Sequence, residues 1–168
     1  LLDATIEGLG ADRGFVVVRE AGKFRAAVAR NFKSEALSRA QEEVSSSISG
    51  AVLEHGRALL LGDALDSAEF GANPSVQRLA IRSLLCGPLV ASAEAFALIY
   101  LENRDISNRF TERHRALLEE ICRLAAPRLR AAIAVEHARK RASELEAAFG
   151  SSDGILTADA GMAAVLET

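Results

Sequence analysis

Two cysteines and three histidines are the residues of this chain best suited to redox chemistry or metal binding. Cys86 and Cys122 lack the CxxC spacing of a zinc or dithiol site. A reactive thiol also needs a nearby positive charge, which the LLCGPL around Cys86 does not supply. His55, His114 and His137 stand too far apart to have the spacing of metal ligands. We therefore expect two buried thiols, a His55 that ends a short helix, and no metal site.

The segment 62–82, GDALDSAEFGANPSVQRLAIR, is the best candidate for a loop that closes over a ligand. Long loops in compact domains are usually functional. This one gathers Asp63, Asp66, Phe70, Asn73, Ser75 and Arg82. In the alternative interpretation the two aspartates bind turn amides, and Asn73 caps a helix that begins at Pro74. No nucleophile with a base, phosphate loop or pair of acid–base carboxylates is recognisable, so we do not expect an enzyme.

The composition is that of a folded domain rather than a nucleic-acid-binding or membrane protein. Of 168 residues, 49% are hydrophobic and 26% are charged, and the net charge is -3. A slightly negative net charge does not indicate a positively charged surface that would bind nucleic acid. No apolar run approaches the roughly 20 residues that span a bilayer, and no signal peptide opens the chain. We expect a cytoplasmic location without membrane contact.

Hydrophobic periodicity predicts the elements that position these residues. AFALIYL is apolar on both faces, which is typical of a strand in the middle of a covered sheet. The order of elements predicts an α+β domain with an antiparallel sheet. The predicted elements are a helix that ends at Gly10, a hairpin of 14–20 and 23–31, a helix in 45–56, a strand at 58–61, and strands at 83–91 and 94–103.

A helical pattern then begins after Thr111 and runs to Gly150, where we expect it to end. A single domain of this size cannot bury so long a helix. Its apolar positions keep a 3–4 spacing, which predicts a parallel coiled coil with a second copy. We expect Pro127 to bend the helix near Ala126; a helix that folds back at Pro127 is the alternative. The residues of this predicted dimer helix are Leu117, Ile121, Leu124, Val135 and Leu145.

Several segments, in the same order, resemble the GAF domain family. SLLCGPLV followed by AFALIYLENR and Phe110 is similar to its closing strands, ISGAVLEHGRALLLGDALDS to its ligand-side helix and strand, and AAIAVEHARKR to its exit helix. The resemblance implies a GAF/PAS-like antiparallel sheet of five to six strands with flanking helices and a long C-terminal helix, over residues 1–145. Two features depart from the family pattern, because ASAEA and Ala97 stand where glycines are common. The resemblance also implies a ligand pocket lined by Phe70, Val76, Arg82, Cys86 and Tyr100.

The closing GILTADAGMAAVLE resembles the entry into the AAA+ module of sigma-54-dependent transcriptional activators. Asp159 would cap its first helix, and Met162, Val165 and Leu166 would form the buried face. The chain begins without Met and stops in these opening turns, so both ends look cut. The resemblance implies a linker at 146–154 and a truncated AAA+ start at 155–168.

The function implied is control of a sigma-54-dependent activator by an unidentified small-molecule effector. In the parent protein, sigma-54 RNA polymerase and DNA would be contacted through other domains. The cyclic-nucleotide signature Asn-Lys-Phe-Asp-Glu is not recognisable, so the cofactor or ligand stays unknown. The alternatives are a ligand-free dimerisation scaffold, a GAF-type redox enzyme and a chromophore sensor.

Overall fold

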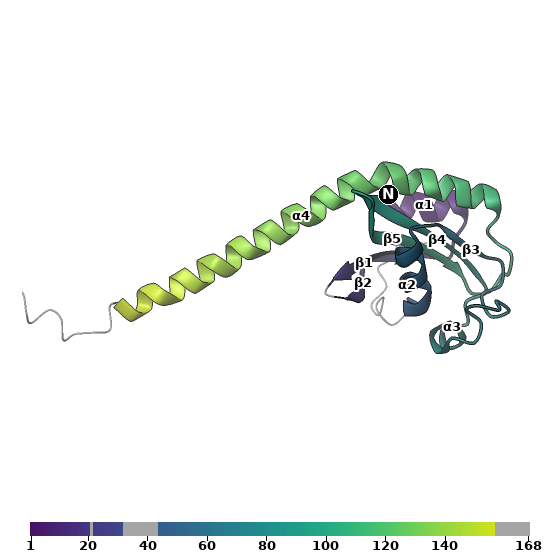
Figure 1. Cartoon of the computed structure of the whole chain (residues 1–168), viewed down its shortest axis with the longest axis horizontal. Helices are drawn as coiled ribbons and strands as arrows, with labels where there is room; N and C mark the ends of the chain where they lie inside the picture. The colour runs from purple at the N-terminus through teal and green to yellow at the C-terminus, as the bar shows by residue number, and fades with distance from the viewer. Residues whose placement is uncertain (21, 32–43, 157–168) are drawn as a thin grey trace, which may run out of the picture. The chain divides into compact units, whose positions relative to one another are not determined.

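The chain folds around one antiparallel sheet of five strands in the order β2-β1-β5-β4-β3 (Figure 1). A computed structural model describes residues 1–20, 22–31 and 44–156. It comprises two compact units, one of residues Leu1–Pro127 and one that begins at Arg128. The strand count agrees with the five to six expected. The strands are β1 Arg13–Glu20, β2 Lys23–Asn31, β3 Leu59–Leu61, β4 Ser83–Ala91 and β5 Glu94–Asn103, and the helices are α1 Leu2–Leu9, α2 Ser46–His55, α3 Pro74–Leu79 and α4 Glu112–Leu156.

Strand β5 lies in the middle of the sheet, as its two-sided apolar pattern predicts. It pairs with β1 on one side and β4 on the other. Tyr100 stands opposite Phe15 and Cys86, and Cys86 stands opposite Leu59. The rings of Phe15 and Tyr100 meet edge to face with centroids 5.8 Å apart. This row of side chains belongs to the core on the α2 and α3 face of the sheet.

Helix α1 and the first turns of α4 cover the other face, opposite α2 and α3 (Figure 1). Successive residues of a strand point to opposite faces, so Gly87 faces α4 while Cys86 faces α2. A Cβ on Gly87 would lie 2.7 Å from Cys122 Sγ and 2.9 Å from Leu118 Cγ. The missing side chain is what allows α4 to pack directly on β4.

Local signals fix the ends of α2 and of the β4–β5 hairpin. Ser45 is the N-cap of α2, and Gly56 ends the helix with a left-handed φ of 61°. The hairpin turns on Ser92 and Ala93, whose φ values of 54° and 64° are both positive. Turns of this kind normally use Asn or Gly, so the departure from the family pattern leaves a turn made of two non-glycine residues.

Helix α4 runs without a break from Glu112 to Leu156 and is 45 residues long. The expectation that the helix ends at Gly150 was wrong, because Gly150 lies inside α4, and the alternative in which the helix folds back at Pro127 does not hold, because Pro127 also lies inside it. The predicted linker at 146–154 is helical, whereas the predicted bend near Ala126 stays a prediction. Residues 157–168, with Asp159, Met162, Val165 and Leu166, lie outside the described residues.

None of the helices within the described ranges is both long enough and apolar enough to cross a membrane.

Candidate ligand site

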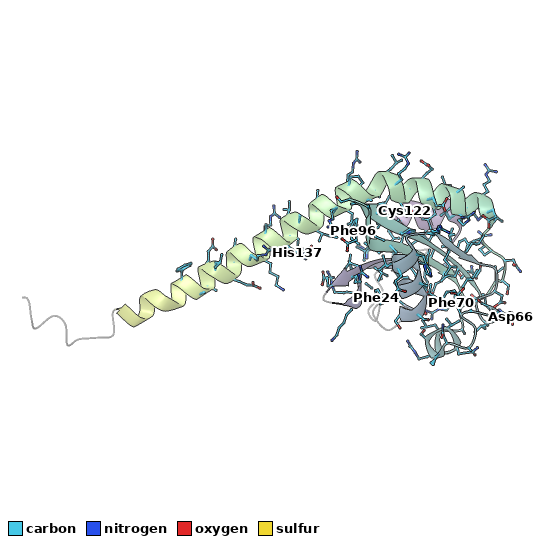
Figure 2. All side chains as sticks on the ribbon, viewed as in Figure 1. Phe24, Asp66, Phe70, Phe96, Cys122 and His137 are labelled. Carbon is cyan, nitrogen blue, oxygen red and sulfur yellow. The ribbon has the colours of Figure 1, made fainter. Side chains whose placement is uncertain are left out.

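The structure brings together four of the five residues predicted to line a pocket. Phe70, Val76, Cys86 and Tyr100 share the buried core between the sheet and the α2 and α3 side. The Arg82 side chain is partly exposed, and its Nη1 pairs with Asp63 Oδ2 at 3.3 Å. Figure 2 shows Phe70 on the α2 side of the sheet and Cys122 on the opposite side. Their role as ligand contacts stays a prediction.

Asp63 is an anchor for the loop. Its Oδ2 accepts a hydrogen bond from the Ser107 hydroxyl at 2.6 Å, and its Oδ1 accepts one from the Leu65 amide at 3.1 Å. The Ser107 hydrogen bond, the Leu65 amide and the Arg82 charge hold the pKa of Asp63 below its ordinary value. The structure therefore agrees with the alternative interpretation, in which Asp63 binds a turn amide.

The loop is also folded tightly on itself. A Cβ on Gly71 would collide with the carbonyl oxygens of Leu65 and Ser67. Asn73 is the N-cap of α3 and Pro74 is its first residue, as expected, although the Asn73 side chain makes no capping hydrogen bond. The compact loop holds Phe70 in the core and presents Glu69 beside α2.

A hollow of about 630 Å³ lies between the C-terminal half of α2 and this loop. We call it the α2–loop hollow. Its apolar wall comprises Val52, Leu59 and Phe70, and polar side chains of both signs line it as well: Glu54, His55, Arg57 and Glu69. Such a combination suits a small molecule with an apolar body and polar groups at its edge.

Sequence reasoning placed Phe70 here but missed the polar residues of this hollow. Glu54 and His55 belong to the last turn of α2, while Arg57 and Glu69 come from the segments that follow. Only the packing of the loop against α2 brings them to one place, so no local signal pointed to them.

Glu102 lies on β5, two residues after Tyr100, and its carboxylate is fully buried. Sequence reasoning also missed this residue. Both Nε and Nη2 of Arg104 lie 2.7 Å from its Oε1. Burial, and then the nearby Glu102 carboxylate, raise the pKa of Tyr100 well above its ordinary value. An acidic residue two positions after Tyr100 in an otherwise apolar strand was the available signal.

The two thiols are buried, as expected, and neither forms a disulfide. Burial raises the pKa of Cys86 well above 9.0 and that of Cys122 to about 12. A thiol that stays protonated at neutral pH is a poor nucleophile. Because the two lie on opposite faces of the sheet, they are not placed to exchange a disulfide with each other. Within the described ranges, no group of three or more histidine, cysteine or carboxylate side chains is placed to hold a metal ion.

The described residues thus form a small α+β domain, with an antiparallel five-stranded sheet, helices on both faces and a buried core on the α2 and α3 side. The family described as "GAF domain" matches residues 1–129, and the chain belongs to this family of signal-sensing domains.

Solved structures share this fold at low sequence identity. The third GAF domain of Slr1393 from Synechocystis, solved in its photoproduct state, is 15% identical, with a TM-score of 0.64 over 81% of this chain and 92% of that one. A domain of a putative two-component sensor histidine kinase from Sinorhizobium meliloti is 23% identical, with a TM-score of 0.59 over 83% and 92%. A type II free methionine-R-sulfoxide reductase from Thermoplasma acidophilum is 18% identical, with a TM-score of 0.54 over 70% and 77%. No curated protein is similar to the chain in sequence.

Proposed function

We propose that this GAF domain is the regulatory, non-catalytic part of a cytoplasmic sigma-54-dependent transcription activator, and that a small molecule in the α2–loop hollow changes the packing of α4. The observation that carries the proposal is that only the thickness of strand β4 separates the core on the α2 side from α4. Cys86 belongs to the ligand-side core, and its neighbour Gly87 lies against Leu118 and Cys122 of α4. A close-packed interior transmits displacement, so a movement of β4 on one face is felt by α4 on the other.

The effector must bind one arrangement of β4 and α4 better than the other, since only differential affinity shifts an equilibrium. The chemistry of the α2–loop hollow favours a small amphipathic molecule. Phe70 and Val52 would contact its apolar part, while Arg57 and the two glutamates would contact polar groups of opposite sign.

The second half of the proposal is a parallel homodimer through α4. In the first unit, Leu117 and Leu124 are 49% and 65% exposed. In the second unit, Val135 and Leu145 are 50% and 58% exposed. Ile121 is half-buried. Together these side chains form the dimer seam.

The sequence register of the dimer seam supports two parallel strands. Ile121 and Val135 fall at a positions, whereas Leu117, Leu124 and Leu145 fall at d positions. β-branched residues at a with Leu at d favour parallel two-stranded coiled coils. In that arrangement Arg141 at g faces Glu146 at e of the other chain, which is a favourable charge pair.

A ligand-free dimerisation scaffold is the second candidate, because the dimer seam supports it equally well. Light scattering coupled to size exclusion tests the seam itself. We expect Leu124→Glu with Val135→Glu to convert a dimer into a monomer, and Lys140→Glu, on the outer side of the same helix, to leave the dimer intact. A dimer that survives the double substitution would refute the seam.

Thermal-shift screening with small organic acids, amines and nucleotides separates the sensor from the scaffold. If the domain is a sensor, we expect at least one compound to raise the melting temperature of the native chain. The same compound should not raise the melting temperature of the double variant Arg57→Gln with Glu69→Gln, which changes two exposed positions. If the same compound stabilises this variant equally, the α2–loop hollow is not the site. If no compound shifts the wild type, the scaffold replaces the sensor.

The transcriptional context rests on the resemblance of GILTADAGMAAVLE to the entry of an AAA+ module. It predicts a GxxxxGK[ST] phosphate loop shortly after Thr168 in the parent reading frame. A parent frame that lacks this loop would remove the transcriptional assignment and leave the GAF domain unaffected.

A further inference from the structure

Both ends of the loop 62–82 meet the chain where it enters α4. Residues 104–111, which we call the lead-in segment, connect β5 to α4. Ser83, the first residue of β4, stands opposite Asn103, the last residue of β5. Leu61, the last residue of β3, pairs with Leu84 and brings the other end of the loop to the same end of the sheet (Figure 1). The two loop ends and the lead-in segment are therefore neighbours in space.

The Ser83 hydroxyl is the centre of this junction, and Ser83 is fully buried. Its oxygen accepts the Arg109 amide at 3.2 Å and the Phe110 amide at 3.3 Å, and the hydroxyl donates to the Leu61 carbonyl at 3.5 Å. A serine hydroxyl has one donor and two acceptor positions, so three backbone groups use its full hydrogen-bonding capacity. One side chain thus ties the residue before the loop, the residue after the loop and the entry to α4.

The Asp63 carboxylate makes a second set of contacts at this junction. The Asp63 side chain is only 14% exposed. Its Oδ2 accepts the Ser107 hydroxyl at 2.6 Å and pairs with Arg82 Nη1 at 3.3 Å. Ser107 belongs to the lead-in segment, and Arg82 is the last residue of the loop. One carboxylate therefore holds both loop ends to the lead-in segment.

Backbone contacts complete the junction. The Asn108 amide donates to the Gly62 carbonyl at 2.6 Å, and the Ala64 amide donates to the Arg82 carbonyl at 2.7 Å. A Cβ on Gly62 would collide with the Asn108 side chain, so the missing side chain permits this close approach. A satisfied hydrogen-bond network of this kind is rigid, because a displacement of one member disturbs several bonds.

We propose that Asp63, Ser83 and Ser107 form a clamp through which a movement of the loop 62–82 is transmitted to the first turn of α4. They are positioning residues, and they act by fixing the lead-in segment to both ends of the loop. The part of the clamp in signalling rests on the proposed function, whereas the coupling itself needs no ligand and is tested without one.

The clamp is a second route from the ligand side of the sheet to α4. Phe70 belongs to the loop and lines the α2–loop hollow, so an occupant of that hollow would act directly on the clamped loop. The contact at Gly87 reaches α4 at Leu118 and Cys122, whereas the clamp acts on the residues just before Glu112, where α4 begins. Because the two routes enter α4 at different turns, a residue-resolved measurement separates them.

The test displaces the loop and reads the response at α4 in ¹H–¹⁵N correlation spectra of the full chain. Gly71→Ala is the first displacement, because the new methyl group would collide with the carbonyl oxygens of Leu65 and Ser67. Ser67→Ala is a milder one, which removes the acceptor of the Phe70 amide. We expect each to shift the amide signals of residues 109, 110 and 112–115.

Clamp variants then show whether the response travels through these side chains. Ser107→Ala removes one contact at a half-buried position, and Ser83→Ala removes the central hydroxyl. In either background, the shifts that Gly71→Ala causes at residues 109, 110 and 112–115 should fall by at least half. Ser92→Ala, at an exposed serine beyond the other end of β4, is the matched control and should leave those shifts unchanged.

Hydrogen exchange separates a clamp from a general loss of stability. Ser83→Ala leaves the Arg109 and Phe110 amides without their acceptor. Their exchange should become faster by about tenfold more than that of the Phe15 amide in β1, as expected for the loss of a buried hydrogen bond. Equal acceleration of all three amides would make Ser83 a purely structural residue and would overturn the proposal.

Two further results would overturn the clamp. One is a loop displacement that shifts the loop amides and leaves residues 109, 110 and 112–115 unchanged, and the other is an undiminished response in the Ser107→Ala chain. Should Ser83→Ala fail to fold, Ser107→Ala decides by the same criterion. A clamp that fails while a compound still raises the melting temperature leaves the proposed function with the Gly87 contact alone. A failure of the compound screen leaves the result of this test unaffected.

Discussion

Gly87 of β4 lies directly against α4, and Gly87→Ala tests that contact. The new methyl group would lie 2.7 Å from Cys122 Sγ and 2.9 Å from Leu118 Cγ. Both neighbours are buried on α4. Carbon atoms pack at about 3.5–4.0 Å, so either α4 or β4 must move by several tenths of an ångström.

The expected cost follows from two opposing effects. Overpacking a dense core typically costs about 1–3 kcal/mol. Replacing a strand glycine by alanine stabilises the folded state by about 0.5–1 kcal/mol, because alanine loses less conformational entropy on folding than glycine does. We therefore expect Gly87→Ala to lower the free energy of unfolding by up to about 2.5 kcal/mol, measured by urea denaturation followed by circular dichroism.

A double-mutant cycle identifies the cause. Cys122→Ala removes the sulfur atom that the methyl group would strike, so the two substitutions together should cost less than the sum of their separate costs, by about 0.5–3 kcal/mol of coupling. Gly8→Ala is the matched control. Gly8 lies in α1 with no atom within 4 Å of the added Cβ, and this substitution should stabilise the domain by about 0.5–1 kcal/mol. A Gly87→Ala substitution that stabilises the domain as much as Gly8→Ala does, or strict additivity with Cys122→Ala, would refute the direct contact between β4 and α4.

Three further predictions concern the core, the hairpin and the thiols. Tyr100→Phe should raise the free energy of unfolding by about 1 kcal/mol, since it removes a buried hydroxyl that has no hydrogen-bond partner among the described residues; a loss of stability in urea denaturation would contradict this. Ala93→Gly should stabilise by about 1 kcal/mol, because Ala93 has a φ of 64° that glycine adopts at little cost; an unchanged urea midpoint would argue against strain in the turn. The folded-state pKa of Cys122 is raised from 9.0 to about 12, so its contribution to stability is complete below pH 9 and is lost as the pH rises toward 12, by up to about 1.4 kcal/mol per pH unit. Cys122→Ala should remove that part of the alkaline loss, and a thiol reagent should modify Cys86 and Cys122 only after unfolding; rapid modification of the native chain would contradict their burial.

The fold could be predicted from sequence where the signal is local. The bounds of β4 and β5 follow from two apolar runs around a short turn, and α2 follows from Ser45 and Gly56 at its ends. The end of α4 could not be predicted from Gly150. One glycine costs a helix only about 1 kcal/mol, which by itself does not end a helix.

The candidate site could be predicted only in part. The family resemblance correctly placed Phe70 and Tyr100 in one core. Their positions depend only on the register of β5 and on one position in the loop, which the family pattern supplies. The role of Arg82 stays a prediction, and the structure adds its ion pair with Asp63, which the sequence did not indicate. The polar residues of the α2–loop hollow depend on how α2 packs on the loop, which no spacing in the sequence reports.

Helix α2 and the first turns of α4 pack on opposite faces of the sheet, and this has a consequence for how a signal would reach α4. Helix α2 packs on β4 and β5 from one face, and Gly87 of β4 lies against Leu118 and Cys122 of α4 on the other. A ligand in the proposed α2–loop hollow would act beside Val52 and Phe70, and a displacement of α2 there would reach α4 through β4. By linkage, anything that favours one packing of α4 must then change the affinity of that ligand by the same factor that the ligand changes the packing equilibrium.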